Sequence, residues 1–175
     1  MTADELLRLN VPDARTELVR GELVVREPAG YRHGNIAARL LVAVGAFVEA
    51  RGLGWVFTAE TGFRLRKDPD TVRAPDGAFV RHDRLPDPSP RGYAALAPDL
   101  VVEVLSPDDP PGEVLSEVGD WLEAGSTLVW VVDPEHRTAR VYRADGSQDH
   151  LGEADRLDGE AVLPGFECEM RRIFG

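Results

Sequence analysis

Two carboxylates in this sequence occupy positions that need a chemical explanation. Glu103 lies inside the apolar run LVVEVL, residues 100–105, and so continuous a run is typical of a strand buried on both faces. Burying a carboxylate is costly unless a cation or hydrogen bonds compensate its charge. A buried salt bridge, or a strand edge reached by water, would explain Glu103 without any function. We favour the interpretation that Glu103 binds a metal ion or takes part in catalysis.

Asp76 is the second candidate, in a segment predicted to be a strand. It follows Pro75, and a Pro-Asp pair taken alone indicates only a turn. Two carboxylates from adjacent strands, with a backbone carbonyl and waters, form the all-oxygen octahedral coordination that suits Mg²⁺. Such an ion would bind a phosphodiester oxygen and lower the pKa of an attacking water.

The elements that must position these carboxylates follow from the sequence pattern. Thr2 and Glu5 have the spacing of a capping box, which predicts a short helix at residues 2–9. The Arg20-Gly21 pair predicts a tight hairpin turn between two strands. Further helices are predicted at residues 32–51, 112–124 and 170–174. Strands are predicted at residues 16–19, 22–26, 55–67, 71–81, 100–105, 128–132 and 137–143.

Length and composition bound the fold and its setting. A chain of 175 residues, 43% hydrophobic and 29% charged, is normally globular, so we expect one domain over residues 1–175. The order of elements predicts an α/β fold with helices against a mixed sheet. No apolar stretch is long enough to span a membrane, and the acidic N-terminus lacks the pattern of a signal peptide. Because Cys168 is the single cysteine, we expect a reducing, cytoplasmic location.

The charge of the chain argues against strong binding to nucleic acid. The formal net charge is −11, whereas phosphate binding normally draws on clustered Lys and Arg. Residues 61–92 hold seven basic side chains against five Asp, while residues 92–136 hold ten acids and no Lys or Arg. An acidic protein from an arginine-biased proteome would explain this pattern without any ligand.

Several motifs occur in the order and spacing of a known family. The two central motifs are RAPD at residues 73–76 and PDLVVEVLSP at residues 98–107. Around them lie ELVRGEL at 17–23, His33 at the start of the long helix, Trp121, AG at 124–125, VWVVDP at 129–134, LPGF at 163–166 and IF at 173–174. On these motifs, over about residues 4–174, the chain resembles the Uma-type endonuclease family of the PD-(D/E)XK nuclease superfamily.

The resemblance implies a fold and a set of site residues. The fold would be a restriction-endonuclease-like core, a mixed β-sheet flanked by helices, with an N-terminal β-hairpin. Asp76, Glu103 and the Val104 carbonyl would bind Mg²⁺ or Mn²⁺. Glu17 and His33 would lie near the same cleft, as groups that orient ligands or transfer protons. Glu17 as a paired strand carboxylate, and His33 as a surface or capping residue, remain the alternatives.

The sequence departs from the family where a lysine is expected. The superfamily lysine falls at Leu105, and the lysine that Uma-type proteins place on the following helix falls at Glu117. The single lysine, Lys67, is predicted to pair with Val72 across a hairpin turn, four residues along the strand from the site. That separation is roughly 13 Å at ordinary strand rise. The cation that would steady developing charge is therefore predicted to be missing.

Three functions are compatible with these residues. The first is a metal-dependent endonuclease acting on DNA, with weak or absent activity because the lysine is missing. The second is a non-catalytic protein of the same fold, acting as a homodimeric or protein-interaction module; the resemblance suggests a homodimer in either case. The third, an acyl hydrolase using Ser106, is disfavoured because the sequence contains no Gly-x-Ser-x-Gly motif. For the first two we expect Glu103 on a central strand with its carboxylate close to Asp76.

Overall fold

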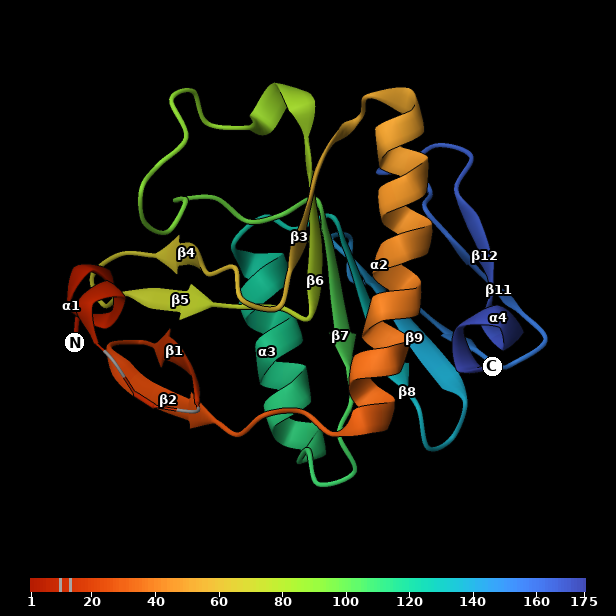
Figure 1. Ribbon diagram of the computed structural model, residues 1–175, viewed down its shortest axis with the longest axis horizontal. Coiled ribbons are helices and arrows are strands. Elements are labelled where there is room, and N and C mark those ends of the chain that lie inside the picture. The colour runs from red at the N-terminus through yellow and green to blue at the C-terminus, as the bar shows by residue number, and fades with distance from the viewer. Residues whose placement is uncertain (10, 13) are drawn as a thin grey trace.

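The computed structural model describes residues 1–9, 11–12 and 14–175, and it has two main β-sheets with helices packed around them (Figure 1). The helices are α1 (Ala3–Arg8), α2 (Tyr31–Arg51), α3 (Pro111–Glu123) and α4 (Met170–Phe174), with a 3-10 turn at His82–Arg84. The strands are β1 (Arg15–Val19), β2 (Glu22–Arg26), β3 (Gly54–Thr58), β4 (Phe63–Arg66), β5 (Thr71–Arg73), β6 (Gly77–Arg81), β7 (Leu100–Val104), β8 (Leu128–Asp133), β9 (Thr138–Arg143), β10 (Gln148–Leu151), β11 (Arg156–Asp158) and β12 (Glu167–Glu169).

The larger sheet has six strands in the order β10-β9-β8-β7-β6-β3. The β7–β8 pair is parallel and the other neighbours are antiparallel, so the sheet is mixed, as predicted. Alternate residues of β7 and β8 point to opposite faces. One set packs with α2 and the other with Val118 and Trp121 of α3. Because a helix covers each face, the run at residues 100–104 is buried throughout.

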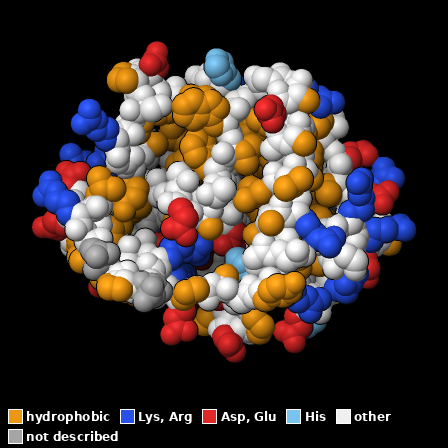
Figure 2. All heavy atoms as spheres, viewed as in Figure 1, with side chains coloured by type: hydrophobic (Ala, Val, Ile, Leu, Met, Phe, Trp, Pro, Cys, Tyr) orange, Lys and Arg blue, Asp and Glu red, His pale blue; other side chains and the backbone are white. Residues whose placement is uncertain are grey.

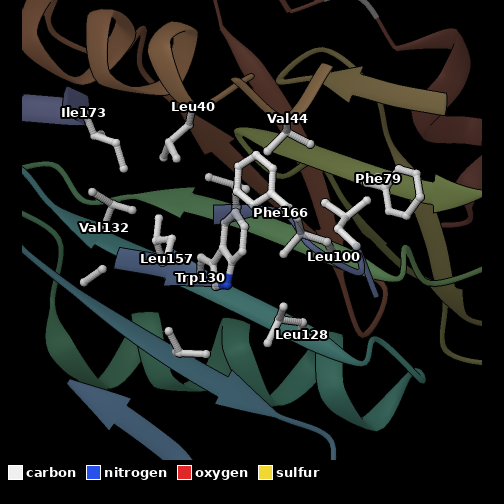
Figure 3. Packing of buried hydrophobic residues seen from close by; sticks show 14 of the residues in the cluster. Leu40, Val44, Phe79, Leu100, Leu128, Trp130, Val132, Leu157, Phe166 and Ile173 are labelled. Carbon is white, nitrogen blue, oxygen red and sulfur yellow. The ribbon is translucent and has the colours of Figure 1, made fainter. Parts of the chain in front are cut away.

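The core on the α2 face is built from α2, the sheet and the C-terminal segment. Figure 3 shows Leu40 and Val44 of α2 above Leu100 and Trp130 of the sheet. Phe166, from the C-terminal segment, stacks on Trp130 with ring centroids 5.8 Å apart. This continuous apolar packing fixes the position of α2, and therefore of its N-terminal end, relative to β7.

The predicted strands 55–67 and 71–81 are each divided between two sheets. β3 pairs with β6 in the six-stranded sheet, whereas β4 pairs with β5 in a second sheet of order β2-β1-β5-β4. The chain changes sheet at residues 74–76, where Pro75 has no N–H to donate and restricts the residue before it. Asp76 therefore lies in this connection, directly before β6, and the prediction that it lies on a strand was wrong.

The predicted register of the second hairpin was also wrong. Val72 pairs with Arg64 rather than with Lys67, and the register shifts between Arg64 and Arg66. Lys67 is exposed and lies in the turn at residues 67–70. The longer turn and the irregular pairing account for the difference, because turn length fixes hairpin register.

The N-terminal hairpin has the predicted turn, and its first strand begins one residue earlier than predicted, at Arg15. Arg20 and Gly21 have φ values of 50° and 84°, and two successive positive φ angles are typical of the turn that matches strand twist. Arg15 pairs with Arg26 at the open end of this hairpin. The capping box of Thr2 and Glu5 is present on α1. In the part of the chain that the structure describes, no helix is long and apolar enough to cross a membrane.

Candidate active site

An open pocket of about 1140 Å³ lies where the two sheets meet the N-terminal ends of α2 and α3. The hairpin contributes residues 25–26, and the segments 27–30 and 103–110 form two further walls. Figure 2 shows acidic, basic and histidine side chains gathered in the hollow between this hairpin and α2. The pocket therefore joins residues from both sheets and from both main helices.

Asp76 lies at the base of this pocket and is almost fully buried. Its Oδ2 accepts a hydrogen bond from the Val104 backbone N–H at 2.8 Å and lies 3.0 Å from His33 Nε2. Its Oδ1 accepts a hydrogen bond from Arg15 Nη1 at 3.2 Å. Burial raises the pKa of Asp76, but His33, the Val104 N–H and Arg15 outweigh burial and lower that pKa below its usual value. Asp76 is therefore a carboxylate held in its charged form.

His33 lies in the first turn of α2 and lines the same pocket. Burial lowers the pKa of His33, but its hydrogen bond to Asp76 outweighs burial and raises that pKa above its ordinary value. The opposite ring atom, Nδ1, is buried and has no hydrogen-bond partner among the described residues. The structure thus brings His33 to Asp76, and its contact is through Nε2.

Glu103 lies on β7 with its side chain on the α3 face, where Trp121 Nε1 donates a hydrogen bond to Oε1 at 2.9 Å. Burial raises the pKa of Glu103 well above its usual value, and the charges of Glu117, Asp76 and Glu17 raise it further. Glu103 has no ion pair among the described residues, and its strand is central in the sheet. Asp76 accepts from the backbone N–H of the residue next to Glu103, and both acids line the same pocket.

Glu17 has a different environment, and its carboxylate is fully buried. Its Oε2 accepts from Arg73 Nη1 at 3.1 Å, and its Oε1 accepts from the Ala74 backbone N–H at 2.8 Å. Arg73 also donates to Asp120 Oδ2 of α3 at 2.6 Å. We call Glu17, Arg73 and Asp120 the Arg73 network. Glu17 does not line the pocket, but it fixes the segment that leads into Asp76.

Glu117 of α3 occupies the position where a lysine was expected, and its acidic side chain lines the pocket. Glu117 lies 3.5 Å from Arg26 Nη2 and 3.8 Å from Arg73 Nη1. Burial and the charge of Glu17 raise the pKa of Glu117 to about 7, although Arg73 and Arg26 act in the opposite direction. Leu105 lines the pocket as well, whereas Lys67 does not. No lysine therefore lies at the site.

Two arginines of the site were missed by the sequence predictions. Arg15 and Arg26 face each other across the N-terminal hairpin, and both line the pocket. The signal was present in the sequence, because a turn at Arg20-Gly21 makes residues 15 and 26 cross-strand partners. The period of two then places Arg15 on the same face as Glu17. The hairpin pattern could not predict which element packs against this face.

Comparison with known proteins places nearly the whole chain in one family. The sequence profile of the Uma2 family, described as "Putative restriction endonuclease", matches residues 3–171. The chain belongs to the Uma2 family. The resemblance drawn from the motifs is therefore confirmed, and no curated protein shows significant similarity to the sequence.

A solved structure supports the fold of this Uma2 family member. It is the crystal structure of a "putative nuclease belonging to DUF820" from Anabaena variabilis, with a TM-score of 0.86 and 21% sequence identity. The match covers 99% of this chain and 97% of that chain. At this identity the likeness shows the fold alone, and it confirms the predicted α/β fold with a mixed sheet flanked by helices.

The donor set of this Uma2 family member fits a hydrated divalent ion better than a closed metal cage. Among the described residues, no three His, Cys, Asp or Glu side chains form a group that could hold a metal ion. Mg²⁺ does not require such a cage, because it keeps several waters and takes one or two carboxylates. Asp76 and Glu103 both line the pocket, and with the Val104 carbonyl they are the groups that would hold such an ion. Burial, and then the charges of Glu117, Asp76 and Glu17, raise the pKa of Glu103.

Proposed function

We propose that this Uma2 family member is a metal-dependent endonuclease that hydrolyses DNA phosphodiester bonds. The observation that supports this proposal is the meeting of Asp76 and Glu103 in one open pocket, with excess negative charge around Glu103. A structural cluster would balance such charge with arginines, as the Arg73 network does. A buried glutamate without an ion pair, beside a charged aspartate in an accessible pocket, is typical of a site for a divalent cation.

The proposed roles follow from the contacts of each side chain. Asp76, Glu103 and the Val104 carbonyl would hold Mg²⁺ or Mn²⁺, which when bound would polarise a phosphate oxygen and lower the pKa of a water. His33 orients the Asp76 carboxylate through Nε2. Glu17 positions residues 73–74 and, being fully buried, is a poor candidate for proton transfer. Mutation of a residue that makes such an orienting contact typically lowers activity or metal affinity by about 10- to 100-fold.

The charge of the pocket predicts slow hydrolysis. The described lining holds two arginines and one histidine, Arg15, Arg26 and His33, against eight acids: Glu27, Glu60, Asp76, Glu103, Asp108, Asp109, Glu113 and Glu117. A phosphate backbone approaching these acids is repelled unless cations neutralise them. We therefore infer that DNA binding requires the divalent ion, and that the absence of a lysine lowers the rate by about 10²–10³-fold.

A cleavage assay with a metal-binding arm tests this function. We expect calorimetry to detect Mn²⁺ binding that Asp76→Ala abolishes, and slow Mn²⁺-dependent nicking of supercoiled DNA that is lost in the same variant. Glu117→Lys should raise the rate, because it returns a cation to the expected position. Failure of the wild-type protein to bind Mn²⁺ at millimolar concentration would contradict the proposal.

A second candidate, a non-catalytic homodimeric module, is favoured by one surface feature. β3 is an edge strand of the six-stranded sheet, and its Trp55 is about half exposed. An apolar edge strand is a ready template for pairing with a second copy of the chain. Light scattering should then give twice the monomer mass of 19.2 kDa. Mn²⁺ binding without any cleavage by the wild-type protein or by Glu117→Lys would favour this candidate.

A further inference from the structure

The proposed hydrolysis requires a cation that the two lysine positions do not supply. Charge develops on the phosphate oxygens in the transition state, and a fixed positive group beside them lowers the barrier. Leu105 and Glu117 occupy the positions expected for lysine. Three basic side chains line the described pocket, namely Arg15, Arg26 and His33. If a side chain of the pocket stabilises the charge on a phosphate, it must be one of these three.

Arg15 and His33 already contact Asp76. Arg15 Nη1 binds Asp76 Oδ1 at 3.2 Å, and His33 Nε2 lies 3.0 Å from Asp76 Oδ2. Moving either cation onto a phosphate would remove a contact that keeps Asp76 charged. Both therefore act on the carboxylate rather than on an incoming ligand.

Arg26 is held differently from the other arginines of this region. Its Nε, Nη1 and Nη2 atoms each face a different carboxylate, those of Glu17, Glu113 and Glu117, at 3.9, 3.8 and 3.5 Å. Charge-assisted hydrogen bonds are normally about 2.7–2.9 Å, so none of these contacts is a tight one. By contrast, Arg73 donates to Asp120 at 2.6 Å and to Glu17 at 3.1 Å.

The exposure of Arg26 adds to this contrast. Its side chain is 26% exposed, against 5% for Arg73. Arg26 is the last residue of β2, an edge strand of the four-stranded sheet, so its guanidinium reaches the pocket from the open end of the hairpin. A guanidinium that is anchored by its strand, exposed to the pocket and only loosely paired can turn onto a phosphate without breaking a strong bond.

We propose that Arg26 is the phosphate-binding residue of this pocket and supplies part of the positive charge that the missing lysine would give. The planar guanidinium donates two parallel hydrogen bonds to non-bridging phosphate oxygens, a geometry in which arginine excels. An arginine stays protonated, so Arg26 takes over charge stabilisation and leaves proton acceptance to another group. The inference rests on the proposed nuclease function, since it assigns a residue of that same site.

The test compares Arg26→Gln and Arg26→Lys with Arg32→Gln. Arg32 is exposed on α2 and does not line the pocket, so its loss controls for net charge. The probe is a fluorescein-labelled single-stranded oligonucleotide titrated in Mn²⁺ at several salt concentrations. We expect Arg26→Gln to weaken binding about 10-fold and to reduce the slope of log K against log salt by about 0.7, the value for one phosphate contact.

Two further readouts separate a phosphate contact from a structural role. We expect Arg26→Gln to lower the cleavage rate by about 10²-fold or more, as for loss of one electrostatic stabiliser. Mn²⁺ affinity should stay the same or increase, because a nearby positive charge has been removed. Arg26→Lys should keep the salt slope but recover only part of the rate, since lysine cannot form the bidentate contact. Arg32→Gln should leave the cleavage rate unchanged.

The outcomes distinguish this inference from the proposed function. Unchanged oligonucleotide binding and cleavage in Arg26→Gln, with cleavage still lost in Asp76→Ala, would overturn the role of Arg26 and leave the nuclease proposal intact. A wild-type protein that binds no oligonucleotide in millimolar Mn²⁺ would also overturn it. If Mn²⁺ fails to bind, the proposed function fails as a whole, whatever Arg26 does.

Discussion

Two groups of buried charges lie side by side at the junction of the sheets, and they differ in how fully cations neutralise their carboxylates. The Arg73 network neutralises its carboxylates with one buried arginine through bonds of 2.6 to 3.1 Å. We define the pocket acids as Asp76, Glu103 and Glu117: Arg15 and His33 bind Asp76, Glu117 lies 3.5 Å from Arg26, and Glu103 has no ion pair among the described residues. Burial and neighbouring carboxylates raise the pKa of Glu103 well above its usual value, and burial and the charge of Glu17 raise the pKa of Glu117 to about 7.

The difference separates a cluster that supports the fold from a cluster suited to a ligand. A buried carboxylate with a full set of donors gains little from an added cation, because its charge is already balanced. A buried carboxylate beside other carboxylates is destabilised, and a divalent ion removes that cost. Substitutions in the two groups should therefore act on different properties, stability in the first and metal binding in the second.

The largest expected effect is on chemistry and falls on the pocket acids. Asp76→Asn keeps the shape of the side chain but loses the charge that would bind the metal ion, so Mn²⁺ binding should disappear and cleavage should fall by about 10³-fold or more. Calorimetry and a plasmid-nicking assay measure the two effects. Cleavage that persists in Asp76→Asn would remove Asp76 from the proposed site and end the contrast between the two groups.

The next effect is on stability and falls on the Arg73 network. Glu17→Gln removes the fully buried partner of Arg73, and breaking a buried ion pair typically costs about 3–5 kcal/mol. Urea denaturation of the metal-free protein should show this loss in the free energy of unfolding. Mn²⁺ affinity measured below the denaturation range should stay close to that of the wild-type protein. A large loss of Mn²⁺ affinity without loss of stability would assign Glu17 to the pocket instead.

The raised pKa of Glu117 should make the stability of the protein depend on pH, which gives a further test of the difference between the two groups. Its pKa is about 7 in the folded protein, against 4.5 for an ordinary glutamate. Between these values the folded state binds more protons than the unfolded state, so stability should decrease as the pH rises from about 4.5 to 7. The loss should be about 3 kcal/mol for a shift of this size. Glu117→Gln should flatten this dependence in chelator-treated protein, and an unchanged pH profile would contradict the raised pKa.

The smallest expected effect is a gain in stability. Glu103→Gln keeps an oxygen that accepts from Trp121 Nε1 but removes a charge disfavoured by its neighbours. At pH 8 and without metal, the free energy of unfolding should be unchanged or higher by about 1 kcal/mol. Added Mn²⁺ should stabilise the wild-type protein but not this variant. A destabilisation as large as that of Glu17→Gln would mean that Glu103 also supports the fold.

Local sequence patterns were sufficient for most elements of the protein. The capping box at Thr2 and Glu5, the turn at Arg20-Gly21 and the buried run around Glu103 each depend on neighbouring residues, and each was found where it was predicted. The family motifs also identified Asp76 and Glu103, which the structure brings to one pocket. The division of the second hairpin was missed, because strand pattern alone does not show where a chain leaves one sheet for another.

The sequence by itself determined the order of the elements, the first hairpin and the two central carboxylates, because these follow from short-range spacing and buried apolar runs. Only the tertiary structure decided which charges meet. Arg15 binds Asp76 across 61 positions of the chain, and Arg26 approaches Glu117 across 91. Such pairs form when two sheets and two helices pack together, and the local pattern around each residue carries no record of that distant partner. The balance of charge, and with it the proposed role of Arg26, therefore emerges only from the packing.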